Sequence, residues 1–95
     1  MIGIIPTAEA LTLMSPDAEP EDGTDVADVL DHKRQSPHYP QLLEEIRRDG
    51  ITVPVVIDYS GPFGELLEGH HRIAAAVDLG LPSVPWSSVP LRIDN

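Results

Sequence analysis

The chain has 95 residues, of which 41% are hydrophobic, and a formal net charge of −10 at pH 7. This length predicts one small domain over residues 1–95, with an acidic N-terminal segment 1–35 and a core 36–95. The absence of cysteine excludes disulfides and thiolate metal sites, and no apolar run approaches the ~18 residues of a membrane span, so we expect a cytoplasmic protein without a membrane partner.

Most of the negative charge lies in the first third of the sequence. Because clustered basic side chains drive non-specific binding to nucleic acids, we expect no direct binding of this chain to duplex DNA. The acidic stretch 17–31 suits a basic surface on a protein partner, and a solvated acidic loop is the alternative. Residues 1–32 contain no lysine or arginine but eight acidic residues: Glu9, Asp17, Glu19, Glu21, Asp22, Asp25, Asp28 and Asp31.

The first third also predicts two short elements. Pro6 is typical of the start of a strand, and the loose alternation of apolar residues over 8–14 predicts an edge strand after it. An acidic loop follows, and Thr24 or Asp25 is a suitable cap for a helix over residues 26–32. The apolar positions of that helix fall on one face: Val26, Val29 and Leu30.

A longer amphipathic helix is predicted to begin at Ser36 and Pro37 and to end at Gly50. Arg47 and Arg48 lie in its last turn, where their charge interacts favourably with the helix dipole. The apolar residues of this helix recur at helical spacing: Tyr39, Leu42, Leu43 and Ile46.

The second half of the sequence predicts a hairpin, a helix and a last strand. Strands are expected over residues 53–59 and 65–68, a helix over 70–79 that ends at Gly80, and a strand over 81–86. This order of elements predicts an α+β fold with a small mixed β-sheet and packed helices. The packed side of the 70–79 helix is expected to carry Ile73, Ala76, Val77 and Gly80.

The segment Gly69-His70-His71-Arg72 is the strongest candidate for a binding site. It stands between a strand that ends at Glu68 and the start of an alanine-rich helix. Backbone N–H groups and the positive end of the helix dipole point out of such a first turn, which suits an anion. Glycine permits close approach of a ligand, and the arginine fork matches phosphate oxygens. The sequence therefore predicts nucleotide phosphate binding at Gly69, His70, His71 and Arg72, and a tight structural turn is the alternative.

Two side chains at this turn are candidates for chemistry. Glu68 can act as a general base or hold a Mg²⁺ ion together with nucleotide phosphates, and His71 can orient an acceptor. A solvent-facing acid at a strand end is the alternative for Glu68. Metal binding by His70 and His71 together is disfavoured, because consecutive helical side chains diverge by ~100°.

A further pattern covers roughly residues 36–86 and consists of residues that stand in a fixed order in and around the predicted helices and strands. It comprises Ile46, Gly50, Pro54-Val55-Val56-Ile57, Leu66, Gly69-His70-His71-Arg72, Ala75-Ala76, Leu79-Gly80 and Pro85. In this order the residues resemble the ParB/sulfiredoxin superfamily, whose members include nucleotide-dependent DNA clamps, ATP-using reductases, small-molecule kinases and nucleases. The resemblance implies the fold of that superfamily, and it implies CTP or ATP/ADP with Mg²⁺ as the ligand.

This sequence differs from each branch of the superfamily at particular residues, and these differences limit the activities that the resemblance implies. Sulfiredoxins have a cysteine in the place of His70, so their reductase chemistry is excluded. Chromosome-segregation ParB proteins have G-E-R-R and continue into a helix-turn-helix domain, which we do not expect here. The form in this chain is closest to D-G-H-H-R members, although Glu68 replaces their aspartate. The stretch Lys33–Ser36 is similar to a nucleotide-contacting K-x-Q-S of sulfiredoxins, but it lies too far before Ile46 for that family's spacing, and we leave it out of the expected site.

Two hypotheses of different classes follow. In the first, the chain binds a nucleotide at Gly69–Arg72 and is a nucleotide hydrolase or phosphotransferase that positions the phosphates with the helix N-terminus and Arg72. In the second, it is a non-catalytic, phage- or plasmid-encoded protein that binds a basic protein through its acidic N-terminal third. The sequence leaves both open.

Overall fold

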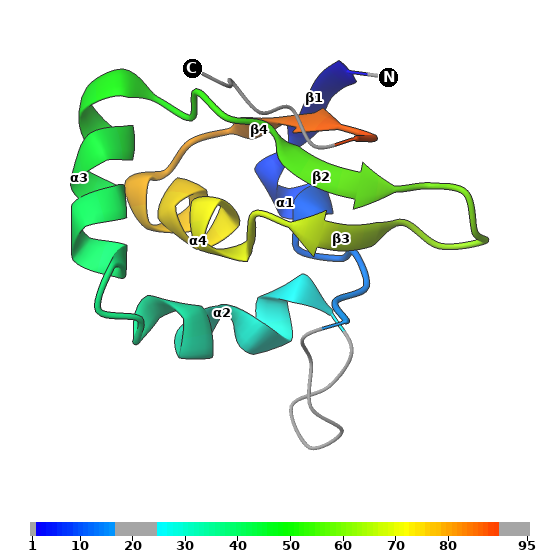
Figure 1. Ribbon diagram of the computed structural model, residues 1–95, viewed down its shortest axis with the longest axis horizontal. Helices are drawn as coiled ribbons and strands as arrows, with labels where there is room; N and C mark the ends of the chain where they lie inside the picture. The colour runs from blue at the N-terminus through cyan, green and yellow to red at the C-terminus, as the bar shows by residue number, and fades with distance from the viewer. Residues whose placement is uncertain (1, 17–24, 90–95) are drawn as a thin grey trace.

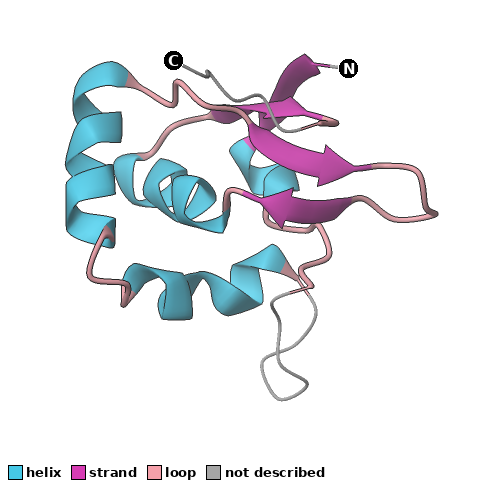
Figure 2. Cartoon of the chain, viewed as in Figure 1, coloured by secondary structure: helices cyan, strands magenta, loops and turns pink. Residues whose placement is uncertain are grey.

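The computed structural model describes residues 2–16 and 25–89, in which helices α1 and α4 lie against a four-stranded sheet and α2 and α3 pack around α4 (Figure 1, Figure 2). In chain order the elements are β1 (Ile2–Pro6), α1 (Thr7–Ala10), α2 (Val26–Arg34), α3 (Tyr39–Asp49), β2 (Val55–Asp58), β3 (Glu65–Glu68), α4 (His70–Leu79) and β4 (Ser83–Ser87).

The sheet is mixed, as expected for the predicted α+β fold. Its strand order is β1-β4-β2-β3, and β2 runs parallel to β4 while the other two pairs are antiparallel. Parallel neighbours need a crossover, and here β3 and α4 together supply it. The hairpin strands and α4 lie where the sequence predicts them.

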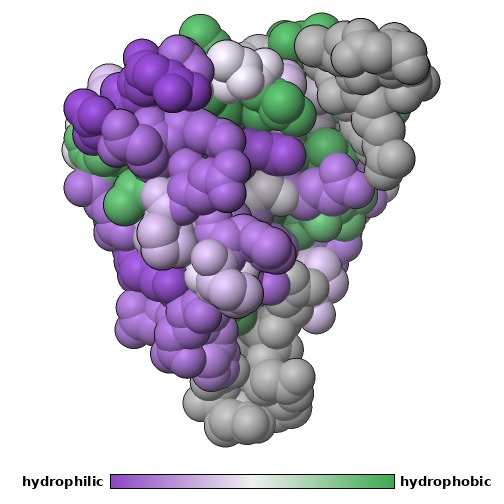
Figure 3. All heavy atoms as spheres, turned by 60° about the vertical axis from the view of Figure 1, so that its left-hand side comes forward, coloured by the Kyte–Doolittle hydropathy of each residue, from purple (hydrophilic) through white to green (hydrophobic). Residues whose placement is uncertain are grey.

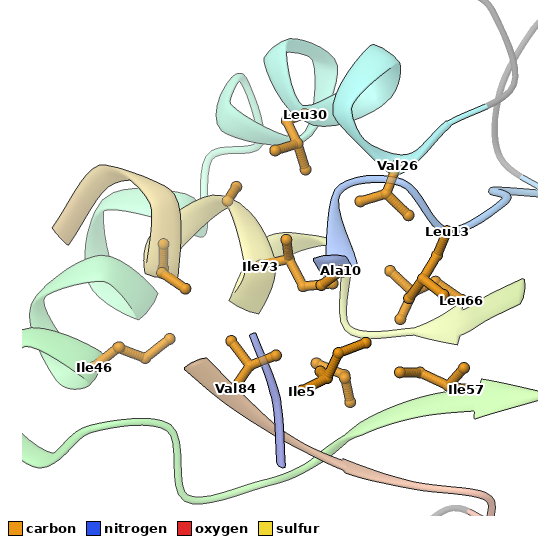
Figure 4. Packing of buried hydrophobic residues seen from close by; sticks show 14 of the residues in the cluster. Ile5, Ala10, Leu13, Val26, Leu30, Ile46, Ile57, Leu66, Ile73 and Val84 are labelled. Carbon is orange, nitrogen blue, oxygen red and sulfur yellow. The ribbon is translucent and has the colours of Figure 1, made fainter. Parts of the chain in front are cut away.

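Helix α4 is the centre of the hydrophobic core because it is covered by the sheet, by α2 and by α3. Ile73 lies among Ile5 of β1, Val84 of β4 and Leu30 of α2 (Figure 4). Three consecutive alanines follow it, all fully buried, and their small size permits close packing on several sides at once. The prediction that Val77 and Gly80 belong to the packed side was wrong, since both are exposed.

The predicted strand over residues 8–14 was also wrong. The strand is β1, which precedes that segment, and Thr7–Ala10 form helix α1. Pro6 ends the strand rather than starting one, and just after it the backbone N–H of Thr7 donates to Pro82 O at 2.9 Å, which joins the start of α1 to the chain before β4. Within residues 8–14, Met14 still makes isolated bridges, to Asp25 and to Glu65.

The predicted ends of the first two long helices are confirmed in part. Helix α2 begins after Asp25, whose backbone N–H donates to the Asp28 carboxylate at 3.0 Å, and its three predicted apolar residues are buried. Helix α3 ends at Gly50 with φ 76° but begins at Tyr39, so the predicted start at Ser36 was wrong. Residues 36–38 instead form the turn between α2 and α3, in which the Tyr39 N–H donates to Ser36 O at 3.0 Å.

Candidate functional site

Gly69 forms the junction between β3 and α4, and α4 begins at His70 as predicted. Its φ of +111° lies in a region that other residues rarely adopt. A Cβ at this position would lie 2.5 Å from Val55 Cγ1 and 3.1 Å from Val55 Cα. The close approach that this glycine permits is therefore an approach to β2, and it places the first turn of α4 directly beside the sheet.

A cavity of about 480 Å³ opens beside this first turn. Three parts of the chain form it: the turn between α2 and α3, the first half of α3, and the start of α4. The surface that carries α3 is mainly hydrophilic (Figure 3). The lining residues are Ser36, His38, Tyr39, Gln41, Leu42, Glu45, Gly69, His71 and Arg72.

Arg72 supplies the positive charge of this cavity. Its side chain is half-buried, and its Nη1 lies 3.5 Å from the carbonyl oxygen of Pro54. Burial lowers the pKa of Arg72, and the negative charge of Glu68 opposes that shift. The guanidinium remains a cation at neutral pH, because arginine is not deprotonated in proteins. Partial desolvation strengthens its attraction for an anion in the cavity.

The two histidines of the turn point to different places. His71 lines the cavity, whereas His70 is only 4% exposed and its Nε2 lies 2.7 Å from Ser15 Oγ. The side chain of His70 thus ties the segment before the acidic loop to the start of α4. Of the predicted phosphate-binding residues, Gly69, His71 and Arg72 come together at the cavity, and His70 is not part of its lining.

Glu68 lies at the exposed end of β3, outside the cavity lining, and its charge acts on Arg72. The acid that does line the cavity is Glu45 of α3, which the sequence analysis did not select. Within residues 2–16 and 25–89, no three side chains of the ligand types His, Asp and Glu gather as a metal site.

Ser36 is a second residue that the sequence analysis missed. The structure places it in the lining of the cavity with Gly69, His71 and Arg72, although the sequence spacing had argued against including it in the expected site. The signal was the similarity of Lys33–Ser36 to the sulfiredoxin K-x-Q-S stretch. The distance from Ser36 to Ile46 in the sequence argued against this similarity. In the structure α3 begins only at Tyr39, and the turn before it lies beside the N-terminus of α4.

Three arginines outside the cavity are held by carboxylates. Arg34 pairs with Asp31 and Asp78, Arg47 pairs with Glu44, and Arg48 pairs with Asp49. Among the described residues these arginines therefore form no uncompensated basic patch. Part of the acidic stretch 17–31, residues 17–24, lies outside the described residues.

One of these pairs belongs to a network behind the cavity wall. The Tyr39 hydroxyl donates to the Asp78 carboxylate, and Arg34 Nη2 lies 3.0 Å from the same carboxylate. Burial, followed by the contact with Asp78, raises the pKa of Tyr39 to about 12. Burial alone would raise the pKa of Asp78, but hydrogen bonds from Tyr39 and Arg34 lower it. The network joins α2, α3 and α4, the helices around the cavity.

This network predicts a loss of stability in alkali. The unfolded chain releases the Tyr39 proton near pH 10 and the folded chain only near 12, so the free energy of unfolding falls between these values, by about 2 kcal/mol. Denaturant unfolding from pH 8 to 12 should show a shallower decline for Tyr39→Phe than for the unaltered chain. If the stability of the two proteins declines equally with pH, the Tyr39 hydroxyl is not buried beside Asp78 as described. Asp78 acts with the opposite sign, because its pKa is lowered in the folded chain. Its contribution to stability is fully present above the ordinary pKa of an aspartate and is lost as the pH falls through the lowered pKa.

The comparisons with known proteins begin with the sequence. No family model matches the chain. It is 37% identical over 43 residues to a ParB-like protein of Sulfolobus acidocaldarius, and 47% identical over 45 residues to the ParB-like nuclease domain-containing protein YnaK of Escherichia coli. These matches cover 45% and 47% of this chain. The chain spans 21% and 48% of the length of these two relatives.

Solved structures match over nearly the whole chain. Sulfiredoxin from Arabidopsis thaliana has a TM-score of 0.60 at 22% identity, over 92% of this chain and 82% of that one. The C-terminally truncated chromosome-partitioning protein ParB from Caulobacter crescentus, complexed with CTP-gamma-S, has a TM-score of 0.61 at 19% identity, over 97% of this chain and 46% of that one. None of the described helices is long and apolar enough to cross a membrane. The mixed sheet and these similarities show that the chain has the fold shared by sulfiredoxin and ParB, and that its sequence is similar to ParB-like proteins.

Proposed function

We propose that the cavity at the start of α4 binds a nucleotide through its phosphates. The observation that carries this proposal is that Gly69, His71 and Arg72 share one cavity with Ser36 of the opposite wall. Its volume of about 480 Å³ lies within the range of small-molecule sites, roughly 300–1,000 Å³. The solved ParB structure with the same fold holds a CTP analogue, which supports a nucleotide as the ligand.

The phosphates are assigned to the α4 side of the cavity. The first N–H groups of a helix are not used by its own i→i−4 ladder, and they add to the positive end of the dipole. Arg72 adds a full charge and a planar fork of N–H groups that can donate to two phosphate oxygens. The opposite wall carries Ser36, His38 and Gln41, whose hydroxyl, ring nitrogens and amide suit the sugar and base of a nucleotide.

A Mg²⁺ ion fits this site as a partner of the phosphates. Mg²⁺ is commonly held by one or two carboxylates together with substrate phosphates. Glu45 is the carboxylate in the cavity lining, and we therefore assign this role to Glu45 rather than to Glu68. When bound, the ion would neutralise phosphate charge. We assign Glu68 a supporting role: its negative charge, at the end of β3, favours the charged form of Arg72.

If the nucleotide is turned over, His71 is the residue that we expect to orient the molecule that accepts the phosphoryl group. It lines the cavity next to Arg72, and histidine exchanges protons near neutral pH. A nucleotide hydrolase or phosphotransferase needs little more from the protein than such positioning and charge stabilisation. Duplex DNA remains an unfavourable ligand, because Arg34, Arg47 and Arg48 are held by carboxylates.

Calorimetric titration with CTP, ATP and ADP, with and without Mg²⁺, tests the proposal. We expect at least one nucleotide to bind with a dissociation constant on the order of 1 µM to 1 mM, the usual range for substrates. The matching nucleoside should bind much more weakly, because it lacks the phosphates. Failure of all three nucleotides and of pyrophosphate to bind would refute the assignment of the cavity.

A further inference from the structure

A second hollow lies at the turn between β2 and β3. It has a volume of about 460 Å³ and shares no lining residue with the nucleotide cavity. Its apolar lining is unusually exposed: Phe63 is 69%, Tyr59 47% and Met14 41% exposed. A smaller neighbouring hollow shares Met14 and Phe63, so the two form one continuous area, which we call the hairpin surface. Contiguous exposed apolar areas of this kind mark sites of protein interaction.

The apolar part of the hairpin surface is held in place from behind. The Tyr59 ring meets the Trp86 ring edge-on, with centroids 5.1 Å apart and planes at 75°. A Cβ on Gly64 would lie 2.7 Å from both Leu13 Cδ2 and Tyr59 Cε1, which shows how closely these side chains pack over the turn. Tyr59 and Leu13 are therefore already ordered, and this part of the surface loses little entropy when a partner binds.

The rim of the hairpin surface is acidic. Glu9 and Asp25 line the larger hollow, and Asp58 and Glu65 line the smaller one. Among the described residues of both linings there is no lysine, arginine or histidine. The pKa of Asp58 is lowered by hydrogen bonds from Ser60, so that carboxylate stays charged well into the acidic range. The described part of the apolar floor is thus bordered by four carboxylates, and no basic side chain is among its described lining residues.

We propose that the hairpin surface docks a basic peptide segment of another protein. One apolar side chain of that segment lies between Met14 and Phe63, and flanking lysines or arginines meet the acidic rim. A second copy of this chain is a poorer occupant, because its described residues Arg34, Arg47 and Arg48 are already held by carboxylates. An anionic membrane is disfavoured by the same rim.

The test uses the full chain and short fluorescein-labelled synthetic peptides, with fluorescence anisotropy as the readout. One peptide alternates Leu and Phe with Lys and Arg. A second replaces its Leu and Phe by Ser, and a third replaces its Lys and Arg by Glu. We expect saturable binding of the first peptide alone, with an affinity that falls as salt rises.

Two variants of the hairpin surface and two matched controls locate the binding. Phe63→Ser should weaken binding about tenfold, and Glu9→Gln with Glu65→Gln should weaken it and flatten the salt dependence. Ile4→Ser, on the opposite sheet edge, and Glu44→Gln, on α3, should leave it unchanged. The nucleotide titration should be unaffected by all four changes, which separates this inference from the proposed function.

Three outcomes would overturn the docking proposal. The first is equal binding of the Ser-substituted peptide, which would reduce the effect to diffuse charge attraction. The second is equal binding to Phe63→Ser and to the unaltered chain. The third is a concentration-dependent dimer in sedimentation that Phe63→Ser abolishes, which would assign the surface to a second copy of this chain.

Discussion

Replacing Gly69 by alanine is expected to destabilise the fold by about 3 kcal/mol or more. Two separate effects add at this position. The φ of +111° is strained for any residue with a Cβ, and the new Cβ would meet Val55 at 2.5 Å. Val55 is fully buried in β2, so the side chain cannot move aside without disturbing the core.

Gly80→Ala is the matched control for this experiment. Gly80 also has a positive φ, +70°, but a Cβ there would meet no other atom within 4 Å. Gly80→Ala should therefore lower the free energy of unfolding by about 1 kcal/mol, which is the cost of the left-handed backbone conformation without any steric clash. Urea unfolding of both variants measures the difference. Equal costs for the two glycines would show that α4 does not lie against Val55 as described.

Arg72→Ala is expected to weaken nucleotide binding about 10- to 100-fold, the loss that corresponds to the roughly 1.5–3 kcal/mol of hydrogen bonds to a charged group. Arg72→Lys keeps the charge but loses the planar fork, so it should recover only part of the affinity. Because the side chain is half-buried, the Arg72→Ala chain should also be slightly less stable than the unaltered chain.

Arg47→Ala is the control for charge alone. Arg47 is an arginine of α3 that is exposed and paired with Glu44, outside the cavity. Calorimetry should find its nucleotide affinity within about twofold of the unaltered chain, since exposed pairs are weak and screened. An Arg72→Ala chain that folds and binds as tightly as the Arg47→Ala chain would remove Arg72 from the site.

The turn at Gly69 could be predicted from the sequence because its signals are local. A glycine after an apolar strand and before an alanine-rich run sets both the φ angle and the start of α4. The different directions of the His70 and His71 side chains are partly local too, since neighbouring helical side chains diverge. Which of the two faces the core depends on Ser15, 55 residues away in sequence, and no local pattern specifies that partner.

The parts that were missed depend on long-range packing. The stretch at Ser36 reads as a helix start, yet Tyr39 packs into the core and pairs with Asp78 of α4, which places the preceding turn over the cavity. β1 lies before Pro6 because β4, some 80 residues later, offers it an edge to pair with. Such partners decide strand and cap positions where local preferences are weak.

The position of the nucleotide is the central claim, and amide NMR during titration with CTP or ATP tests it most directly. We expect the largest shifts at the amides of residues 69–73 and of Ser36, and no change at residues 58–65 of the hairpin surface. Shifts concentrated at residues 58–65, with none at the start of α4, would contradict it.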